Sequence, residues 1–214
     1  MSSPVGSLPA DAIRQAAIRW FWIVFAVTTA FQIMRLQQDN AASWLAVDYV
    51  MRLAALGLLA FSPVRHVVFC REALSITYPQ LLVRTMAAGA AVALAFLIGW
   101  VLWRTMPDLS LGHYPRTVGF LYALDLTAGI ALTAVHEELV FRRLAKVAFG
   151  RLGNGFAMIA ATSLVFALFH WWTGPWNMLM VALVAVALMM LYRAVGALWP
   201  AILLHYCADL YAFW

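Results

Sequence analysis

The stretch MAAGAAVALAFLIGWVLW, residues 86–103, contains no charged side chain. A helix needs about 20 predominantly apolar residues to cross the hydrocarbon core of a bilayer. Alanine and glycine fill the first half of the stretch, and small side chains of this kind let two helices pack closely inside a membrane. The stretch therefore predicts a transmembrane helix, which we place, with its flanking residues, at residues 82–103.

The composition of the whole chain indicates the same environment. The 214 residues are 65% hydrophobic and 11% charged, with a mean hydropathy of +0.87, whereas a soluble domain carries about 25% charged residues. Only helices or closed barrels satisfy every backbone polar group in lipid. The apolar runs are long and unbroken, unlike the alternating strands of a barrel. We therefore predict an all-α fold, a polytopic membrane helical bundle.

Apolar runs and the polar or glycine-containing breaks between them predict about seven transmembrane helices. We place them at residues 18–36, 44–61, 82–103, 117–149, 156–172, 176–192 and 198–213. A basic, mixed stretch at residues 63–80 is expected to lie outside the hydrocarbon core, as a helix on the membrane surface.

Lysine and arginine side chains set the expected orientation of the bundle. Nine of them flank the predicted spans on the side of the N-terminus, whereas Arg35, Arg104 and Arg116 flank them on the other side. Loops that are rich in lysine and arginine stay in the cytoplasm. We therefore expect a cytoplasmic N-terminus. The net charge of +5 is explained by this topology and predicts no nucleic-acid partner.

The segment HEELVFRR, residues 136–143, contains five ionisable side chains, of which Glu137, Glu138 and Arg142 form the first candidate group, within the fourth predicted span. His170 follows in the fifth span, and His205 and Asp209 lie one helical turn apart in the seventh. Ionisable side chains are costly in hydrocarbon, and by default they indicate a functional site. These three groups therefore form the candidate site.

Helix geometry predicts that the groups meet. The break GRLGNG at residues 150–155 lies midway between Glu137 and His170, so an antiparallel hairpin folded there brings both to the same depth. Glu138 can pair with Arg142, because residues four apart share a helix face. Carboxylates and histidines in a buried pocket suit acid–base chemistry, in which a glutamate activates water and a histidine holds the water or stabilises an oxyanion.

Other ionisable residues in the spans are given a structural interpretation. Asp48 and Arg52 are four apart in the second span and are expected to neutralise each other. Asp125 is expected to form a hydrogen bond with Thr127 or with another helix. His136 points about 100° away from the neighbouring glutamate on its helix, and we assign it no role in the site.

Three motifs resemble those of one family of membrane proteases. EELVFR at residues 137–142 fits EExxxR, FALFH at 166–170 fits FxxxH, and HYCAD at 205–209 fits HxxxN/D. Together they resemble the CPBP group of intramembrane proteases, also called the CAAX protease and bacteriocin-processing or ABI family. The resemblance covers about residues 117–214, which we take as a protease-like catalytic core. Residues 1–116 then form an N-terminal region of three transmembrane helices and the surface segment.

The resemblance implies a glutamic-type endopeptidase with its active site in the membrane. In that scheme Glu137 and His170 activate the water, and His205 with Asp209 binds the oxyanion. The further residues that it implies are Glu138, with Arg142 and Phe166 in supporting roles. The family's CAAX-processing members usually have asparagine at the position of Asp209. An aspartate donates to an oxyanion only when it is protonated, and otherwise it orients His205.

Members of the family have also been described as metallopeptidases. The candidate zinc ligands in this chain are Glu138, His170 and His205. HEELV lacks the second histidine of the HExxH zinc motif, because Val140 stands in its place. We therefore expect a mechanism without a metal or another cofactor.

The site is expected to lie nearer the outer face of the membrane. From Glu137 to the end of its predicted helix at Phe149 is about 18 Å, in a hydrocarbon core of about 30 Å. An outward-opening pocket suits a protein-sorting or maturation peptidase of the bacterial inner membrane. Such an enzyme removes a membrane-embedded C-terminal segment from an exported protein, so its partners are a membrane-anchored protein or peptide and the lipid bilayer.

Two other functions also use buried glutamate and histidine. A proton-coupled transporter predicts a polar path and paired broken helices from an inverted repeat, but the first, third and sixth spans are nearly all apolar. A non-catalytic binding or immunity protein with the same fold predicts that loss of Glu137 or His170 is tolerated.

Overall fold

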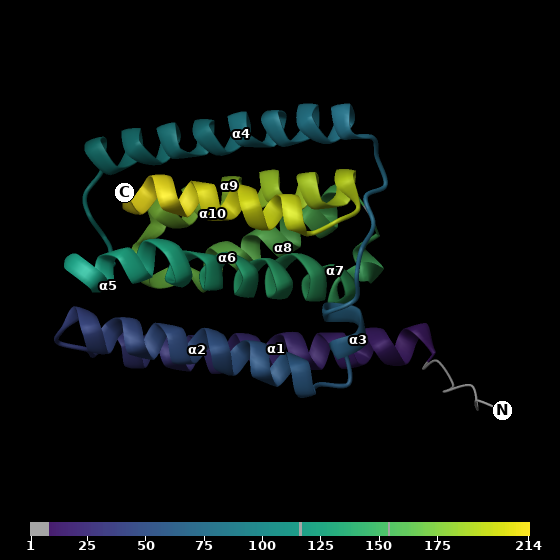
Figure 1. Cartoon of the computed structure of the whole chain (residues 1–214), viewed down its shortest axis with the longest axis horizontal. Coiled ribbons are helices and arrows are strands. Elements are labelled where there is room, and N and C mark those ends of the chain that lie inside the picture. Colours follow the sequence, from purple (N-terminus) through teal and green to yellow (C-terminus); the bar gives the residue numbers. More distant parts are fainter. Residues whose placement is uncertain (1–8, 116, 154) are drawn as a thin grey trace.

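The computed structural model describes residues 9–115, 117–153 and 155–214, and within them the chain is helical without any strand. The helices, drawn in Figure 1, are α1 (Ala10–Leu36), α2 (Ala41–Phe61), α3 (Arg65–Val68), α4 (Tyr78–Thr105), α5 (Gly119–Leu124), α6 (Ile130–Glu138), α7 (Ala145–Ala148), α8 (Phe156–Phe169), α9 (Pro175–Val195) and α10 (Trp199–Phe213). Outside the described residues lie residues 1–8, Arg116, which is one of the basic residues that predict the orientation, and Asn154 in the GRLGNG break. The predicted all-α bundle is confirmed.

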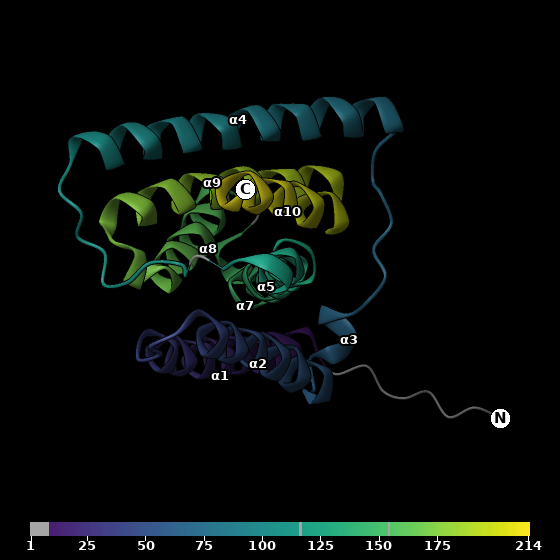
Figure 2. The same ribbon diagram turned by 60° about the vertical axis from the view of Figure 1, so that its left-hand side comes forward.

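The helices form three layers, which Figures 1 and 2 show from two sides. The pair α1 and α2 lies on one side and α4 on the other, with α5 to α10 between them. Helix α4 packs on α9 and α10, α1 packs on α2 and α7, and α10 packs on α6. The middle layer carries the three motifs and is covered by helices on both sides, so the motifs lie inside the bundle.

Within the described residues, five helices are long and apolar enough to cross a membrane: α1, α2, α4, the continuous helix Gly119–Ala148 that contains α5 to α7, and α9. The other two predicted spans are short, with 14 residues in α8 and 15 in α10. At ~1.5 Å per residue these helices are about 21 and 22 Å long, less than a hydrocarbon core of about 30 Å. Helix α8 ends at Phe169, so His170 lies at a helix end in the interior of the bundle.

The expected surface helix at residues 63–80 is wrong for most of its length. Only α3 is helical within this stretch, and α4 begins at Tyr78 with a capping box formed by Thr77 and Gln80. Ser75 instead donates from its backbone N–H and its hydroxyl to the carbonyl of Val195 at the end of α9, at 2.9 and 2.8 Å. Pro79 in the first turn of α4 also prevents a helix from continuing through it, because proline has no N–H to donate.

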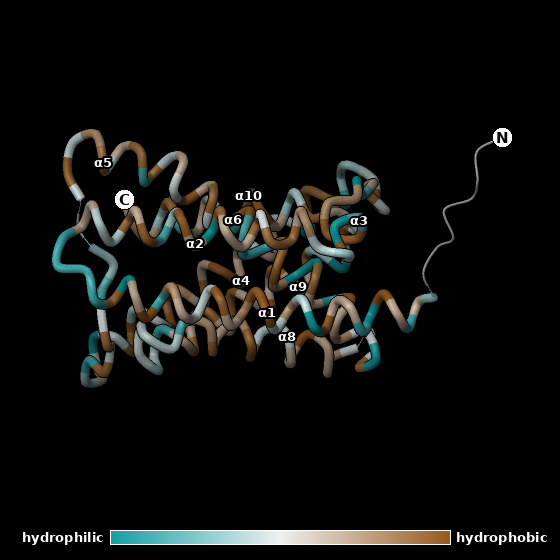
Figure 3. The backbone as a smooth tube through the Cα atoms, turned by 90° about the horizontal axis from the view of Figure 1, so that it is seen from below, coloured by the Kyte–Doolittle hydropathy of each residue, from teal (hydrophilic) through white to brown (hydrophobic). Residues whose placement is uncertain are grey.

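The distribution of side chains is that of a protein in lipid. Figure 3 shows hydrophobic residues along most of each long helix. Large apolar side chains such as Leu82, Met86 and Leu94 on α4 are exposed, whereas charged side chains such as Asp48 and Arg142 are buried. A charged group inside such a bundle needs a partner from the protein, because neither lipid nor the apolar core can solvate it.

Candidate active site

His205 on α10 connects the two glutamates at the end of α6. Its Nδ1 forms a hydrogen bond of 2.9 Å with Oε1 of Glu138, and its Nε2 lies 3.7 Å from Oε2 of Glu137. Asp209, one turn further along α10, places Oδ2 3.5 Å from the same Nε2. The structure therefore brings together the first and third predicted groups, with the imidazole between three carboxylates.

Arg142 extends the cluster on the other side of Glu138. Its Nε lies 3.3 Å from Oε2 of Glu138, and both side chains are fully buried. The guanidinium lies over the ring of Phe166 on α8, with 4.7 Å to the centroid, a distance at which a cation is attracted to the face of a ring. The predicted pair of Glu138 and Arg142 is present, and Phe166 packs against its cation.

The backbone at the end of α8 sets the orientation of His170. Its Nδ1 lies 2.9 Å from the carbonyl oxygen of Phe166, and a carbonyl can only accept, so Nδ1 carries the hydrogen. The Nε2 of a neutral His170 is then an acceptor. Together with Glu137, His205 and Asp209, His170 lines a cavity of about 390 Å³. The three sequence motifs therefore meet at one cavity.

Sequence reasoning missed the partner that Glu137 has on α2. Arg52 donates from Nη1 to Oε1 of Glu137 at 2.9 Å, and from Nε to Oδ2 of Asp48 at 2.8 Å. The expected pair of Asp48 and Arg52 is thus present, but it also reaches the site. Arg35, expected to flank the membrane, is buried instead and donates to Asp48. The sequence signal that points to this contact is the charged pair Asp48 and Arg52, which lie four residues apart inside an apolar span.

Comparison with known proteins gives a match over the part of the chain that carries the motifs. Residues 119–211 match the model of the family described as type II CAAX prenyl endopeptidase Rce1-like. This segment, which we call the Rce1-like segment, is similar to that family. No curated protein and no solved structure matches the chain. The Rce1-like segment runs from α5 to near the end of α10 and includes every residue of the three motifs, whereas Arg52 and its partners on α1 and α2 lie outside it.

Asp125 and His136 of the Rce1-like segment do not line the site cavity. Asp125 accepts hydrogen bonds from the hydroxyls of Tyr49, at 2.7 Å, and Tyr114, at 2.9 Å. The expected hydrogen bond with Thr127 is wrong, because the hydroxyl of Thr127 donates to the backbone carbonyl of residue 123. The expected partner on another helix is present, since Tyr49 lies on α2. His136 is fully buried beside Arg52, 3.5 Å from Nη1.

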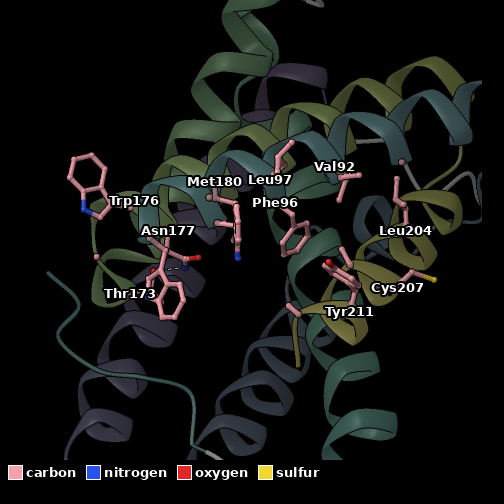
Figure 4. Close-up of a pocket in the computed structure, with 18 of the residues that line it drawn as sticks. Val92, Phe96, Leu97, Thr173, Trp176, Asn177, Met180, Leu204, Cys207 and Tyr211 are labelled. Atoms are coloured by element: carbon pink, nitrogen blue, oxygen red, sulfur yellow. Dashed lines mark hydrogen bonds between the residues drawn. The ribbon is translucent and has the colours of Figure 1, made fainter. Parts of the chain in front are cut away.

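A second, larger cavity lies beside the site, between α4, α9 and α10. It has a volume of about 1000 Å³. Figure 4 shows Phe96 of α4, Met180 of α9, and Leu204 and Tyr211 of α10 around it. Phe96 and Met180 also line the site cavity, as does Ala208, so the two cavities share a wall. An apolar space therefore adjoins the polar cluster of the Rce1-like segment.

Among the described residues, the candidate zinc ligands do not converge on one point. Tetrahedral zinc needs ligand atoms that converge on one point at about 2.0–2.2 Å. Glu138 and His205 are bonded to each other through Oε1 and Nδ1, whereas His170 donates from Nδ1 to a backbone carbonyl and keeps Nε2 free. Within the described residues, no group of three or more histidine, cysteine, aspartate or glutamate side chains is arranged to hold a metal ion. We derive no step through a metal.

Proposed function

We propose that the chain is an intramembrane endopeptidase that hydrolyses a peptide bond near a membrane-embedded C-terminal segment of a substrate protein. The observation that carries the proposal is the cavity lined by Glu137, His170, His205 and Asp209 within the Rce1-like segment. Four ionisable groups at one buried place are costly unless they serve chemistry. An acid, a base and a donor at one cavity are the groups that peptide hydrolysis needs.

In the proposed mechanism Glu137 is the general base. Its Oε1 accepts from Arg52, so Oε2 is the oxygen that can face a water in the cavity. Nε2 of His170 accepts a second hydrogen bond from that water. Glu137 takes a proton as the water oxygen attacks the carbonyl carbon, and the proton passes to the amine as the C–N bond breaks. The products are a carboxyl terminus and a free amine.

His205 is the proposed electrophile. Its Nδ1 is held by Glu138, which Arg142 holds in turn, and its Nε2 is directed toward Glu137 and Asp209 at the cavity. When protonated on both nitrogens, His205 donates from Nε2 to the oxyanion of the tetrahedral intermediate. A preorganised donor of this kind acts most strongly in a site from which water is excluded. Asp209 orients the ring.

The large cavity is the proposed route for the substrate. Its apolar lining suits a hydrophobic segment, and its shared wall with the site brings such a segment next to Glu137. The site cavity also reaches Asp108 and His113 in the loop between α4 and α5, at the end of the bundle opposite α3 (Figure 1). With the N-terminus in the cytoplasm, this end faces outward, which suits an exported substrate in a bacterial inner membrane.

Reporter processing in cells tests the proposed function. The chain is co-expressed with an exported reporter that carries a C-terminal transmembrane tail, and with a second reporter that ends in a prenylated CAAX motif. We expect the wild type to release the first reporter, and a His170→Ala variant at matched expression to release none. Unchanged processing in the variant would favour the non-catalytic binding protein. Cleavage of the CAAX reporter alone would instead assign prenylated CAAX proteins as the substrate class.

Filling the large cavity should impair substrate entry. Cys207 lines this cavity and is exposed (Figure 4). We expect Cys207→Trp to lower kcat/KM for the tailed reporter at least about fivefold, a change of about 1 kcal/mol, because the indole would occupy space that the substrate needs. The matched control is Leu203→Trp, on the same helix but lining neither cavity. Equal cleavage by Cys207→Trp and Leu203→Trp would exclude the route.

A further inference from the structure

We propose that Arg52 is a positioning residue for Glu137, and that Arg35 and Asp48 hold Arg52 in place. The inference rests on the proposed function, because it concerns the general base of that reaction. All three residues lie before the Rce1-like segment, on α1 and α2, so the family match does not include them. The N-terminal helices would then take a direct part in setting up the site.

The contacts of Arg52 occupy both ends of its guanidinium. Nε and Nη2 face Asp48, at 2.8 Å from Oδ2 and 3.2 Å from Oδ1. Nη1 reaches Oε1 of Glu137 at 2.9 Å. The planar fork of an arginine holds two carboxylates at a fixed relative geometry, which the point charge of a lysine cannot do. Arg52 thus ties the orientation of Glu137 to Asp48.

The charges around Asp48 indicate that Glu137 balances the positive charge of Arg52. Asp48 is almost fully buried and already pairs with Arg35. Arg52 adds a second buried cation, and Asp48 can balance only one of the two. An unmatched charge in this interior would be strongly unfavourable. Glu137 supplies the missing negative charge, so the contact is more than a by-product of neutralising Asp48.

Arg35 is itself held rigidly. Its guanidinium contacts two indole rings that are inclined to each other by 62°, at 4.3 Å from the centroid of Trp44 and 4.5 Å from that of Trp172. Trp172 belongs to the turn that directly follows His170. A cation that lies over two aromatic faces gains attraction from both and loses freedom to rotate. One cluster therefore anchors the arginine pair beside the segment that positions His170.

The other groups around Glu137 make weaker contacts with it. From α10, Nε2 of His205 is 3.7 Å away, and Asp209 lies beyond that ring. His170 shares the cavity from the end of α8, and His136 is a neighbour on α6. Among the side chains that the structure describes, Arg52 is the hydrogen-bond donor to Glu137. Its loss should leave Glu137 both mobile and easier to protonate.

Kinetics of purified variants test the inference, with the tailed reporter as substrate and the protein in lipid nanodiscs. We expect Arg52→Gln to lower kcat by about 10²-fold, the effect of a reacting group misplaced by about 1 Å, with KM little changed. The acid limb of its pH–rate profile should move to higher pH. Arg52→Lys keeps the charge without the fork, so its acid limb should stay near that of the wild type while kcat falls.

The matched control is Arg143→Gln, which removes another buried arginine that lines neither cavity and pairs with Glu72 at 3.4 Å. We expect wild-type kcat and pH dependence from it. An unshifted acid limb and wild-type kcat in Arg52→Gln would overturn the inference and leave the proposed function standing. If Arg52→Gln does not fold, wild-type kcat in Arg52→Lys overturns it. A wild type that cleaves no reporter overturns the proposed function and this inference with it.

Discussion

A Glu137→Gln variant should cleave almost no substrate and should be less stable than the wild type, because it leaves the charge of buried Arg52 unmatched. Glutamine has the same size, and its carbonyl oxygen can still accept the hydrogen bond that Arg52 donates to Oε1. It cannot take a proton from water, so the general base is lost. A positioned general base contributes about 10²–10⁴-fold to a rate. We expect a loss of kcat near the upper end of that range, because among the described residues Glu137 is the carboxylate at the cavity that an arginine of α2 holds.

Single-turnover cleavage of the tailed reporter by purified protein measures this loss. Glu72→Gln is the matched control, since Glu72 accepts a hydrogen bond from Tyr192 at 2.6 Å and lines neither cavity. Glu72 is partly exposed, so Glu72→Gln should change the melting temperature less than Glu137→Gln does. Cleavage by Glu137→Gln at the rate of Glu72→Gln would remove Glu137 from the mechanism.

His205→Ala should reduce both activity and stability. Alanine removes the partner of Glu138 at 2.9 Å and leaves Glu137 and Asp209 without the ring between them. Breaking a buried, paired contact by removing one partner costs about 3–5 kcal/mol. Loss of one donor to an oxyanion costs about 10²–10³-fold in kcat. We therefore expect a lower melting temperature together with a loss of cleavage.

A second substitution separates these two effects. In the variant His205→Asn, the side-chain amide can donate to Glu138 in place of Nδ1 but offers no donor at the position of Nε2, so part of the stability should return while cleavage stays absent. His66→Ala, an exposed histidine on α3, is the control and should change neither property. If cleavage returned together with stability, the role of His205 would be structural.

Local patterns of the sequence predicted the elements and the motif residues well. Hydropathy depends on each segment alone, so the long apolar runs located the helices of Figure 1 to within a few residues over most of the chain. Helical spacing put Glu138 beside Arg142, and His205 beside Asp209, because both pairs are four residues apart on one helix. The hairpin around residues 150–155 brought Glu137 and His170 to one cavity.

Contacts between helices that are distant in the sequence could be known only from the tertiary structure. Arg52 reaches Glu137 because α2 packs against α6 at one depth and rotation, and neither quantity is encoded in the periodicity of α2. Arg35 is buried against Trp44 and Trp172, and Asp125 accepts hydrogen bonds from tyrosines. These contacts also depend on how distant helices pack.

The sequence by itself thus determined a helical membrane bundle and the side chains that could do chemistry, because solvation in lipid and helix geometry act locally. Tertiary packing alone decided which charges neutralise one another, where the apolar cavity opens beside the site, and which helix end presents His170. In a low-dielectric interior each buried charge must find a partner from the protein. That partner is selected by the packing of whole helices, here α1 against α2 and α2 against α6.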